Sequence, residues 1–424
     1  MDGNRKPTSC LVVGNYCHDV LMKDDVVLGE SLGAAAAFVS AVLDGVAVAS
    51  TFVAKVGTDF AYPVTHPPRV SPSSGTTLFH AHFSSQVQRE DRVLRRVHAC
   101  DPIGPSDLPD SRRFEFGLAV GVGGEILPDT LEKMLDICET VLVDVQALIR
   151  VFDGGDGTVG LVKLRDSGFY HLLPRIGFLK ASSDEAPYID VDEAKNACCV
   201  VLTNGEEGCR VHYRDVEQHI APFPTLQVDP TGAGDSFLGG LVFGLVQGLN
   251  VPDAALLGNF FGSLTVSQVG LPKFDMGLLQ AVKNEVQRKK LHHEELNEKL
   301  VFAKPLDHDD FHKSLLRAKN LPLSHQECQL ELPEGRDRGD DNLQSSRPTR
   351  RTCSPTEQGR TGRELGSPTP RSVSRKNMTM QIEPPNGPTN SRGWALQEKP
   401  TTSPEVGNKP RSEKSPLANH PQLS

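Results

Sequence analysis

Apolar and polar stretches alternate along the chain in a way that predicts strands and helices in turn. Short apolar runs bounded by glycine or polar residues are typical of buried strands, and apolar residues at helical spacing are typical of helices packed on a sheet. Because the two patterns alternate, the expected fold class is α/β, with a doubly wound, mostly parallel sheet flanked by helices. Strands are predicted at 10–14, 51–57, 116–122, 141–144, 176–179 and 199–203, a hairpin at 210–213 and 218–221, and helices at 33–43, 128–138, from 183 or 192, at 252–268 and at 276–291.

Residues 62–113 interrupt this alternation of strands and helices. They are rich in Pro, Ser, His and Arg and contain short alternating apolar pieces, which is typical of exposed strands. We therefore expect this segment to leave the core and form a small β lid.

The C-terminal part has a different composition from the rest. Residues 301–424 hold 15 of the 31 prolines but only three aromatic residues. Such a segment cannot bury enough apolar surface to offset the entropy lost on ordering. The expected organisation is a folded domain at 1–295, ending between Leu291 and Leu300, followed by a disordered low-complexity tail at 296–424.

Charge and cysteine usage narrow the class of protein. The formal net charge of −9 gives no indication of a nucleic-acid or anionic-membrane partner. No run of 18 or more apolar residues predicts a membrane span. The polar N-terminus lacks a signal-peptide core, and the nine cysteines show no C-x-x-C spacing. We therefore expect reduced thiols and a cytoplasmic location.

The stretch D-P-T-G-A-G-D-S-F-L-G-G at 229–240 carries the strongest chemical signal. Gly232 and Gly234 permit positive φ and close approach of the backbone, and a helical apolar pattern follows at once. A glycine turn before a helix is an anion-binding site, because free N–H groups and the helix dipole meet there. Asp235 falls in the first turn, where an acid either caps the helix or acts as a base beside a bound phosphate. The residues alone leave both interpretations open.

The full stretch resembles the signature D-P-T-G-A-G-D-x-F of the pfkB, or ribokinase-like, carbohydrate kinases, and the resemblance covers roughly residues 9–290. It implies a ribokinase-like fold and phosphoryl transfer from ATP, with Mg²⁺, to a hydroxyl group. It assigns Asp235 as the general base and the backbone of Gly232, Ala233, Gly234 and Asp235 as the anion hole. It also places Thr231 and Gly232 beside ATP.

Three further elements, namely the loop at 203–208, Asn259 and Glu185, match positions that bind the nucleotide or the metal ion in that family. The loop T-N-G-E-E-G at 203–208 resembles its T-x-G-x-x-G element, which implies ATP contacts at Thr203, Gly205 and Gly208. Asn259 occupies the place of its adenine pocket, although an Asn inside a helix is otherwise often a packing residue.

Glu185 matches the acid of the family's N-x-x-E element, which orders Mg²⁺ through water, while Ser182 replaces the Asn. One carboxylate is sufficient, because Mg²⁺ keeps waters and binds the substrate phosphates. The alternative interpretation of Glu185 is an acid in the first turn of a helix.

Asp19 is the candidate for binding the acceptor. It follows the glycine that ends the first strand by five residues, where a carboxylate can accept hydrogen bonds from two hydroxyls of a polyol. An acid capping a loop turn is the alternative. The resemblance assigns Asp19 and Gly33 to the acceptor, but Ala34 and Phe38 replace the family's second glycine and its Asn. These departures indicate a non-standard acceptor.

Four other segments are similar to the plant inositol kinases within that family. The similarity implies myo-inositol as the polyol acceptor and a role in inositol-phosphate and phytate metabolism. A kinase of another sugar or nucleoside, and a catalytically idle regulatory relative, remain alternatives. In this family such lids can also pair two subunits, so a homodimer is possible. The segments are 14–20, 99–103, 144–153 and 173–185.

Two other motifs are not expected to carry chemistry. The G-x-G-x-x-G at 155–160 neither follows a strand directly nor opens an apolar helix, so it lacks the context of a dinucleotide site. The histidine and acid clusters at 292–295 and 307–310 are interpreted as solvated charge rather than as metal ligands.

Overall fold

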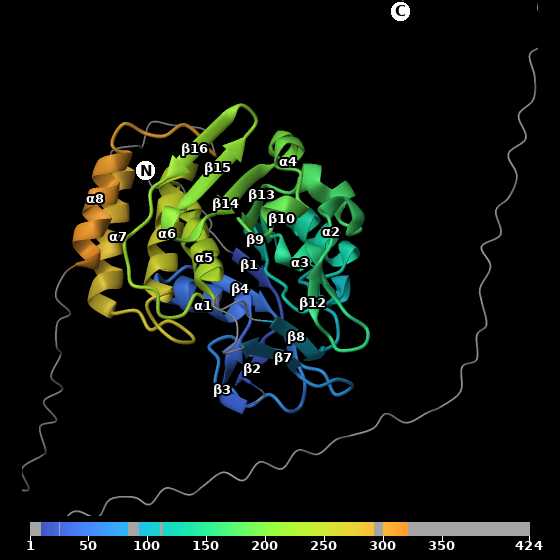
Figure 1. The fold of residues 1–424 in the computed structure, drawn as a ribbon. Coiled ribbons are helices and arrows are strands. Elements are labelled where there is room, and N and C mark those ends of the chain that lie inside the picture. The colour runs from blue at the N-terminus through green and yellow to red at the C-terminus, as the bar shows by residue number, and fades with distance from the viewer. Residues whose placement is uncertain (1–9, 25, 84–92, 111–112, 292–299, 321–424) are drawn as a thin grey trace, which may run out of the picture. The chain divides into compact units, whose positions relative to one another are not determined.

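The computed structural model describes residues 10–24, 26–83, 93–110, 113–291 and 300–320. Its main feature is an eight-stranded sheet with the order β16-β15-β14-β13-β10-β9-β1-β4 (Figure 1). Neighbours from β14 to β4 are parallel, and β15 and β16 are antiparallel. The predicted α/β class is therefore confirmed. The strands are β1 (Cys10–Val13), β4 (Ser50–Val53), β9 (Phe114–Ala119), β10 (Cys138–Asp144), β13 (Phe178–Ser182), β14 (Cys199–Thr203), β15 (Cys209–Tyr213) and β16 (Val216–Ile220).

Helices cover both faces of this sheet (Figure 1). One face packs against α1 (Ala35–Gly45), α5 (Ala233–Val246), α6 (Val251–Thr265), α7 (Met276–Leu291) and α8 (His308–Lys319), and the other against α2 (Pro128–Ile137) and α4 (Val191–Ala197). Residues of β10 alternate between the two cores, with Leu142 in one and Val141 and Val143 in the other. Burial on both faces explains why the parallel strands read as continuous apolar runs.

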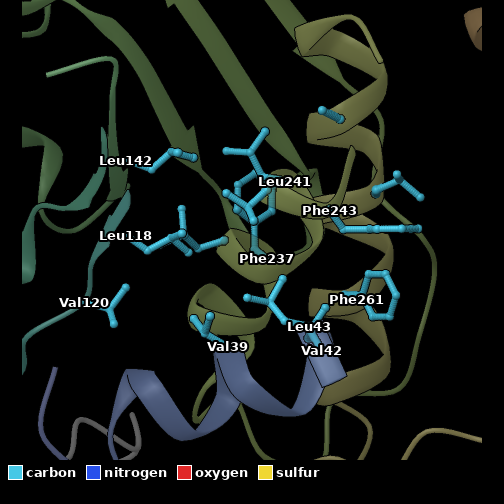
Figure 2. Close-up of a cluster of buried hydrophobic side chains, with 14 of the residues drawn as sticks. Val39, Val42, Leu43, Leu118, Val120, Leu142, Phe237, Leu241, Phe243 and Phe261 are labelled. Carbon is cyan, nitrogen blue, oxygen red and sulfur yellow. The ribbon is translucent and has the colours of Figure 1, made fainter. Parts of the chain in front are cut away.

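The larger core fixes the position of α5. Figure 2 shows Leu118 and Leu142 of the sheet pointing towards Phe237 and Leu241 of α5, with Val42 of α1 below them. All five side chains are at least 97 % buried. Burying side chains of this size stabilises the fold by roughly 1.5–3 kcal/mol each. The N-terminal end of α5 is therefore held against the end of the sheet.

Glycines let α5 and α6 pack closely. A Cβ atom on Gly240 would lie 2.5 Å from the carbonyl oxygen of Leu257, and one on Gly244 would lie 2.6 Å from Cα of Ala254. No side chain fits in that space, so the G-G-x-x-x-G spacing in α5 is a packing requirement.

A second, four-stranded sheet has the order β3-β2-β7-β8. The lid was expected at 62–113, but only β7 (Thr77–Phe83) and β8 (Val93–His98) lie there. The other half comes from β2 (Cys17–Lys23) and β3 (Val26–Gly33), so the predicted lid boundary is wrong. Six of the eight residues of β3 are exposed, which removes the alternation that would have identified it. A short pair, β5 (Lys55–Val56) and β6 (Arg69–Val70), forms a separate two-stranded sheet.

Helix α8 corrects the expected end of the folded part, which was set between Leu291 and Leu300. Its apolar side chains Phe311 and Leu315 are 5 % and 0 % exposed and belong to the larger core. The residues around this single amphipathic helix are polar, so the sequence did not predict it. The tail expected beyond residue 320 lies outside the described residues.

Three smaller expectations can be checked within the described ranges. The seven cysteines there are buried free thiols. No helix in these ranges is both long and apolar enough to cross a membrane. The G-x-G-x-x-G stretch covers part of the turn between β11 (Arg150–Phe152) and β12 (Val159–Leu161) and the start of β12, which confirms that it does not open a helix.

Candidate functional site

The glycine turn before α5 has the predicted positive φ at Gly232 but not at Gly234, which is already part of the helix. Gly232 is left-handed, with φ of 75°, and directly precedes the helix. A Cβ atom there would lie 2.1 Å from the Phe38 ring, so both the backbone angle and the packing require glycine. Phe38 therefore packs beneath the turn. The Ala233 N–H donates to the Pro230 carbonyl at 3.3 Å, which leaves the amides of Gly232, Gly234 and Asp235 as the expected anion donors.

Asp235 lies in the first turn of α5, as predicted. Its Oδ1 accepts a hydrogen bond from Nε2 of Gln146 at 3.2 Å. Desolvation raises the pKa of Asp235, and the nearby cations Lys180 and Arg150 oppose this shift only in part. A carboxylate with a raised pKa is a better proton acceptor than an ordinary aspartate, which suits a general base.

A buried ion pair lies beside this turn. Asp144 ends β10 and Lys180 lies opposite it on β13, with Nζ 2.9 Å from Oδ2. Their side chains are 0 % and 7 % exposed. Burial raises the pKa of Asp144 to about 6. Desolvation lowers the pKa of Lys180, but Asp144, Glu185 and Asp235 outweigh it, so the net shift is upward.

Glu185 is in the same electrostatic neighbourhood, because its charge acts on Asp144, Lys180 and Asp235. It also exchanges hydrogen bonds with Ser182: the Ser182 N–H donates to Oε2 at 2.8 Å, and the Glu185 N–H donates to Oγ at 3.2 Å. No group of three or more metal-ligating side chains occurs in the part of the chain that the structure describes. A single carboxylate fits Mg²⁺, whose other ligands are phosphates and waters.

A cavity of about 600 Å³ adjoins the first turn of α5. This volume is in the usual range for small-molecule sites. Thr203, Gly205, Gly208 and Asn259, all predicted for the nucleotide, line it. Ala233 and Gly234 line it too, whereas Thr231 and Gly232 do not.

Asn259 also has the packing role that was its alternative. Its Nδ2 donates to the carbonyl oxygens of Ile220 and Ala221, both at 3.0 Å. These bonds fix the end of β16 against α6, and the wall of the cavity continues from the next residue, Pro222. Asn259 therefore shapes the cavity through its side-chain amide.

The two predicted acceptor residues lie together. A Cβ atom on Gly33 would lie 2.0 Å from Oδ2 of Asp19, so the carboxylate rests directly over the glycine backbone. Asp19 lies in β2 opposite Ser31 of β3, and hence on a lid strand rather than in a loop. Ala34 keeps a positive φ of 82° where the resembling family has glycine. The backbone geometry is retained even though the residue has changed, at a cost of about 1–3 kcal/mol in strain.

Four residues of the site were not identified from the sequence: Asp144, Gln146, Arg150 and Lys180. The charge of Arg150 lowers the pKa of Asp235 and that of the Cys17 thiol. The charge of Asp19 also acts on the Cys17 thiol and raises its pKa. Arg150 is thus close enough to act on the charge of the predicted base, Asp235, and on the surroundings of the predicted acceptor residue, Asp19. Two of the four could have been identified in the sequence, because a charged residue is rarely buried without a function or a partner. Lys180 lies inside an apolar strand, and Asp144 lies at the end of one.

The fold and the site together define a class. A doubly wound sheet with a glycine turn, a helix N-terminus and a half-buried acid beyond its carboxyl ends is the arrangement of a ribokinase-like phosphotransferase. A pyrophosphate-dependent kinase in the ribokinase family, solved with sulfate, has the same fold, with a TM-score of 0.55 at 17 % identity over 62 % of this chain and 97 % of that one.

Sequence comparisons identify the family. The model for pfkB family carbohydrate kinases matches residues 180–273. Inositol 3-kinase of Arabidopsis thaliana is 60 % identical over 312 residues, 73 % of this chain and 87 % of that protein. Inositol 3-kinase of Oryza sativa is 54 % identical over 328 residues, 73 % and 82 % of the two chains. The chain belongs to the pfkB family of carbohydrate kinases, as its signature indicated, and is a phosphotransferase with an alcohol group as acceptor.

Proposed function

We propose that the protein transfers the terminal phosphoryl group of ATP to a hydroxyl of myo-inositol. The observation that carries the proposal is Asp235, which lies in the first turn of α5 beside the cavity and is hydrogen-bonded to Gln146. The identity to plant inositol 3-kinases supports the acceptor. The product would enter inositol-phosphate and phytate metabolism in the cytoplasm.

The geometry of the turn supports the following transfer step. Asp235 accepts the proton of the acceptor hydroxyl while the acceptor oxygen forms a bond to phosphorus. The bond from phosphorus to the bridging oxygen of ADP breaks, and ADP keeps the electron pair. Backbone N–H groups of Gly232, Gly234 and Asp235 stabilise the charge on the transferred group, and Gln146 keeps the Asp235 carboxylate oriented. Asp19, over Gly33, accepts hydrogen bonds from two hydroxyls of the ring and orients it.

The donor occupies the cavity beside α5 in this proposal. Thr203, Gly205 and Gly208 approach its phosphates and ribose, and the end fixed by Asn259 holds the base. Thr231, whose N–H donates to Asp229 at 2.9 Å, stabilises the turn that presents Gly232. Mg²⁺ would neutralise phosphate charge, with Glu185 in its outer shell.

We also propose that the lid sheet pairs two copies of the chain. β3 is an edge strand, and its residues Val26, Val27 and Leu28 are 62 %, 52 % and 57 % exposed. An exposed apolar edge of this kind favours pairing with another strand. Light scattering should give the mass of a dimer, and Val27→Lys should give a monomer. A monomeric wild-type protein would contradict this part of the proposal.

The experiment that tests the function uses purified protein, ATP, Mg²⁺ and a panel of cyclitols, sugars and nucleosides. We expect phosphorylation of myo-inositol, with the position read by phosphorus and proton NMR of the product. Preferred turnover of a sugar or a nucleoside would replace the acceptor. Nucleotide binding without turnover of any compound in the panel would support the idle regulatory alternative.

A further inference from the structure

Lys180 is a buried cation that the proposed mechanism does not use. It lies on β13, the strand of the parallel sheet that precedes Glu185, and 93 % of its side-chain surface is removed from solvent. A lysine in such a place is normally destabilising, because its charge loses water. The ion pair with Asp144 offsets part of this cost. It does not explain why the ammonium group points at the beginning of α5.

The position of the ammonium group is set by the glycine turn. A Cβ atom on Gly234 would lie 2.9 Å from Nζ of Lys180 and 3.5 Å from Cε. The absence of a side chain at position 234 is therefore what allows the lysine to reach the first turn of the helix. Gly234 also lines the cavity, so the ammonium group lies just behind its wall.

Electrostatics make this placement unusual. The N-terminal end of a helix carries partial positive charge, which repels a cation and attracts an anion. The carboxylates of Asp144, Glu185 and Asp235 act electrostatically on the Lys180 ammonium group at this position. Nζ of Lys180 donates one hydrogen bond to Oδ2 of Asp144, at 2.9 Å. The other two protons of the ammonium group are therefore available for other acceptors. An arrangement that opposes the helix dipole is expected where a strongly anionic ligand binds.

We propose that Lys180 binds the transferred phosphoryl group through its ammonium group, from the Gly234 side of the turn, and so completes the anion hole. This role rests on the proposed phosphoryl transfer. Nζ donates to a non-bridging oxygen of the terminal phosphate, in the ground state and more strongly as charge develops during transfer. Asp144 fixes the rotamer of the lysine from below. The lysine gains and loses no proton in the step, since the acceptor proton goes to Asp235.

Lys180→Met tests the proposal, with Lys133→Met as its matched control, because Lys133 forms an exposed ion pair with Asp110 on the other face of the sheet. The first measurement is calorimetric and needs no acceptor. Wild-type protein should bind the β,γ-imido analogue of ATP more tightly than ADP, and Lys180→Met should reduce this preference roughly tenfold or more. The second is turnover, for which kcat should fall about 10²–10³-fold. Lys133→Met should change neither.

A second variant guards against misfolding. Lys180→Met alone leaves the buried Asp144 unpaired, so the double variant Lys180→Met/Asp144→Asn removes both charges and should fold with a melting temperature near that of the wild type. It should still lack the preference for the ATP analogue. A folded double variant that keeps the wild-type preference would overturn the proposal, and so would a wild type with no preference for the terminal phosphate. The wild type could instead phosphorylate no polyol and still prefer the ATP analogue over ADP in a way that depends on Lys180. That result would overturn only the proposed acceptor chemistry.

Discussion

Two aspartates occupy the same position in consecutive helices and have different surroundings. Asp235 lies in the first turn of α5 and Asp253 in the first turn of α6. Asp253 forms an ion pair with Lys289, 3.1 Å from Nζ to Oδ2, and a 2.6 Å hydrogen bond with Nδ1 of His308. All three of these side chains are at most 3 % exposed.

Partners and backbone separate the roles of the two carboxylates. Asp235 accepts from a neutral amide, Gln146, and follows a left-handed glycine beside a cavity. Asp253 follows Pro252 and is bound by two basic side chains from α7 and α8. A carboxylate bound in this way holds helices together, whereas one bound by a single amide keeps oxygen lone pairs for a proton. The histidine cluster at 307–310, expected to be solvated charge, is therefore partly a buried structural element, which corrects that expectation.

Asp235→Asn should have the largest effect. We expect kcat to fall about 10²–10⁴-fold, because the amide cannot accept the hydroxyl proton. The melting temperature should stay within a few degrees of wild type, since Asn can still accept from Gln146. Steady-state kinetics and calorimetry measure the two quantities. Near-normal turnover would show that Asp235 is a helix cap rather than the base.

Asp253→Ala should show the opposite pattern. Removing the carboxylate leaves Lys289 and His308 buried with fewer partners, and the free energy of unfolding should fall by about 3 kcal/mol. Turnover measured well below the melting temperature should be unchanged.

The matched control for Asp253 lies on α8. Asp310→Ala removes the exposed partner of Lys313, and it should cost less than about 1 kcal/mol. Urea denaturation of the three proteins measures the difference. Equal losses for the two variants would contradict the structural role of Asp253.

Gln146→Leu should separate the base from its orienting amide. The base must be ionised, so the rate falls as pH decreases through the pKa of Asp235, which desolvation raises. The hydrogen bond from Gln146 lowers that pKa. Its removal should move the acidic limb of the kcat profile to higher pH, with a smaller change in kcat on the plateau. An unshifted limb would mean that another group controls it.

Ala34→Gly should have the smallest effect and should stabilise the protein. Ala34 has φ of 82° at the start of α1, the helix whose Phe38 packs on Gly232. Relief of this strain exceeds the entropic cost of glycine, for a net gain of about 1 kcal/mol. Ala41→Gly, inside the same helix, is the control and should instead lose about 1 kcal/mol. Destabilisation by both substitutions would show that Ala34 is not strained.

Sequence reasoning found the candidate residues that lie within one stretch of chain and missed those that neighbouring strands bring together. The turn at 229–240, the loop at 203–208 and Asp19 were identified because each has a contiguous pattern. Lys180 was missed because its partner Asp144 lies 36 residues away. The lid was misplaced because β2 pairs with β7 across more than fifty intervening residues, and only that pairing shows that Asp19 lies on a lid strand.

By itself, the sequence determined the α/β class, the glycine turn, the acid in the first turn of α5 and the resemblance to carbohydrate kinases. These depend on local conformation: glycine at positive φ, helical periodicity, and apolar runs that suit a buried strand. The tertiary structure decided which aspartate is held by basic side chains and which by an amide. It also decided that Lys180 reaches the first turn of α5 through the space left by Gly234. The physical reason is that burial and charge pairing depend on which strands and helices become neighbours, and local sequence patterns do not encode those distances.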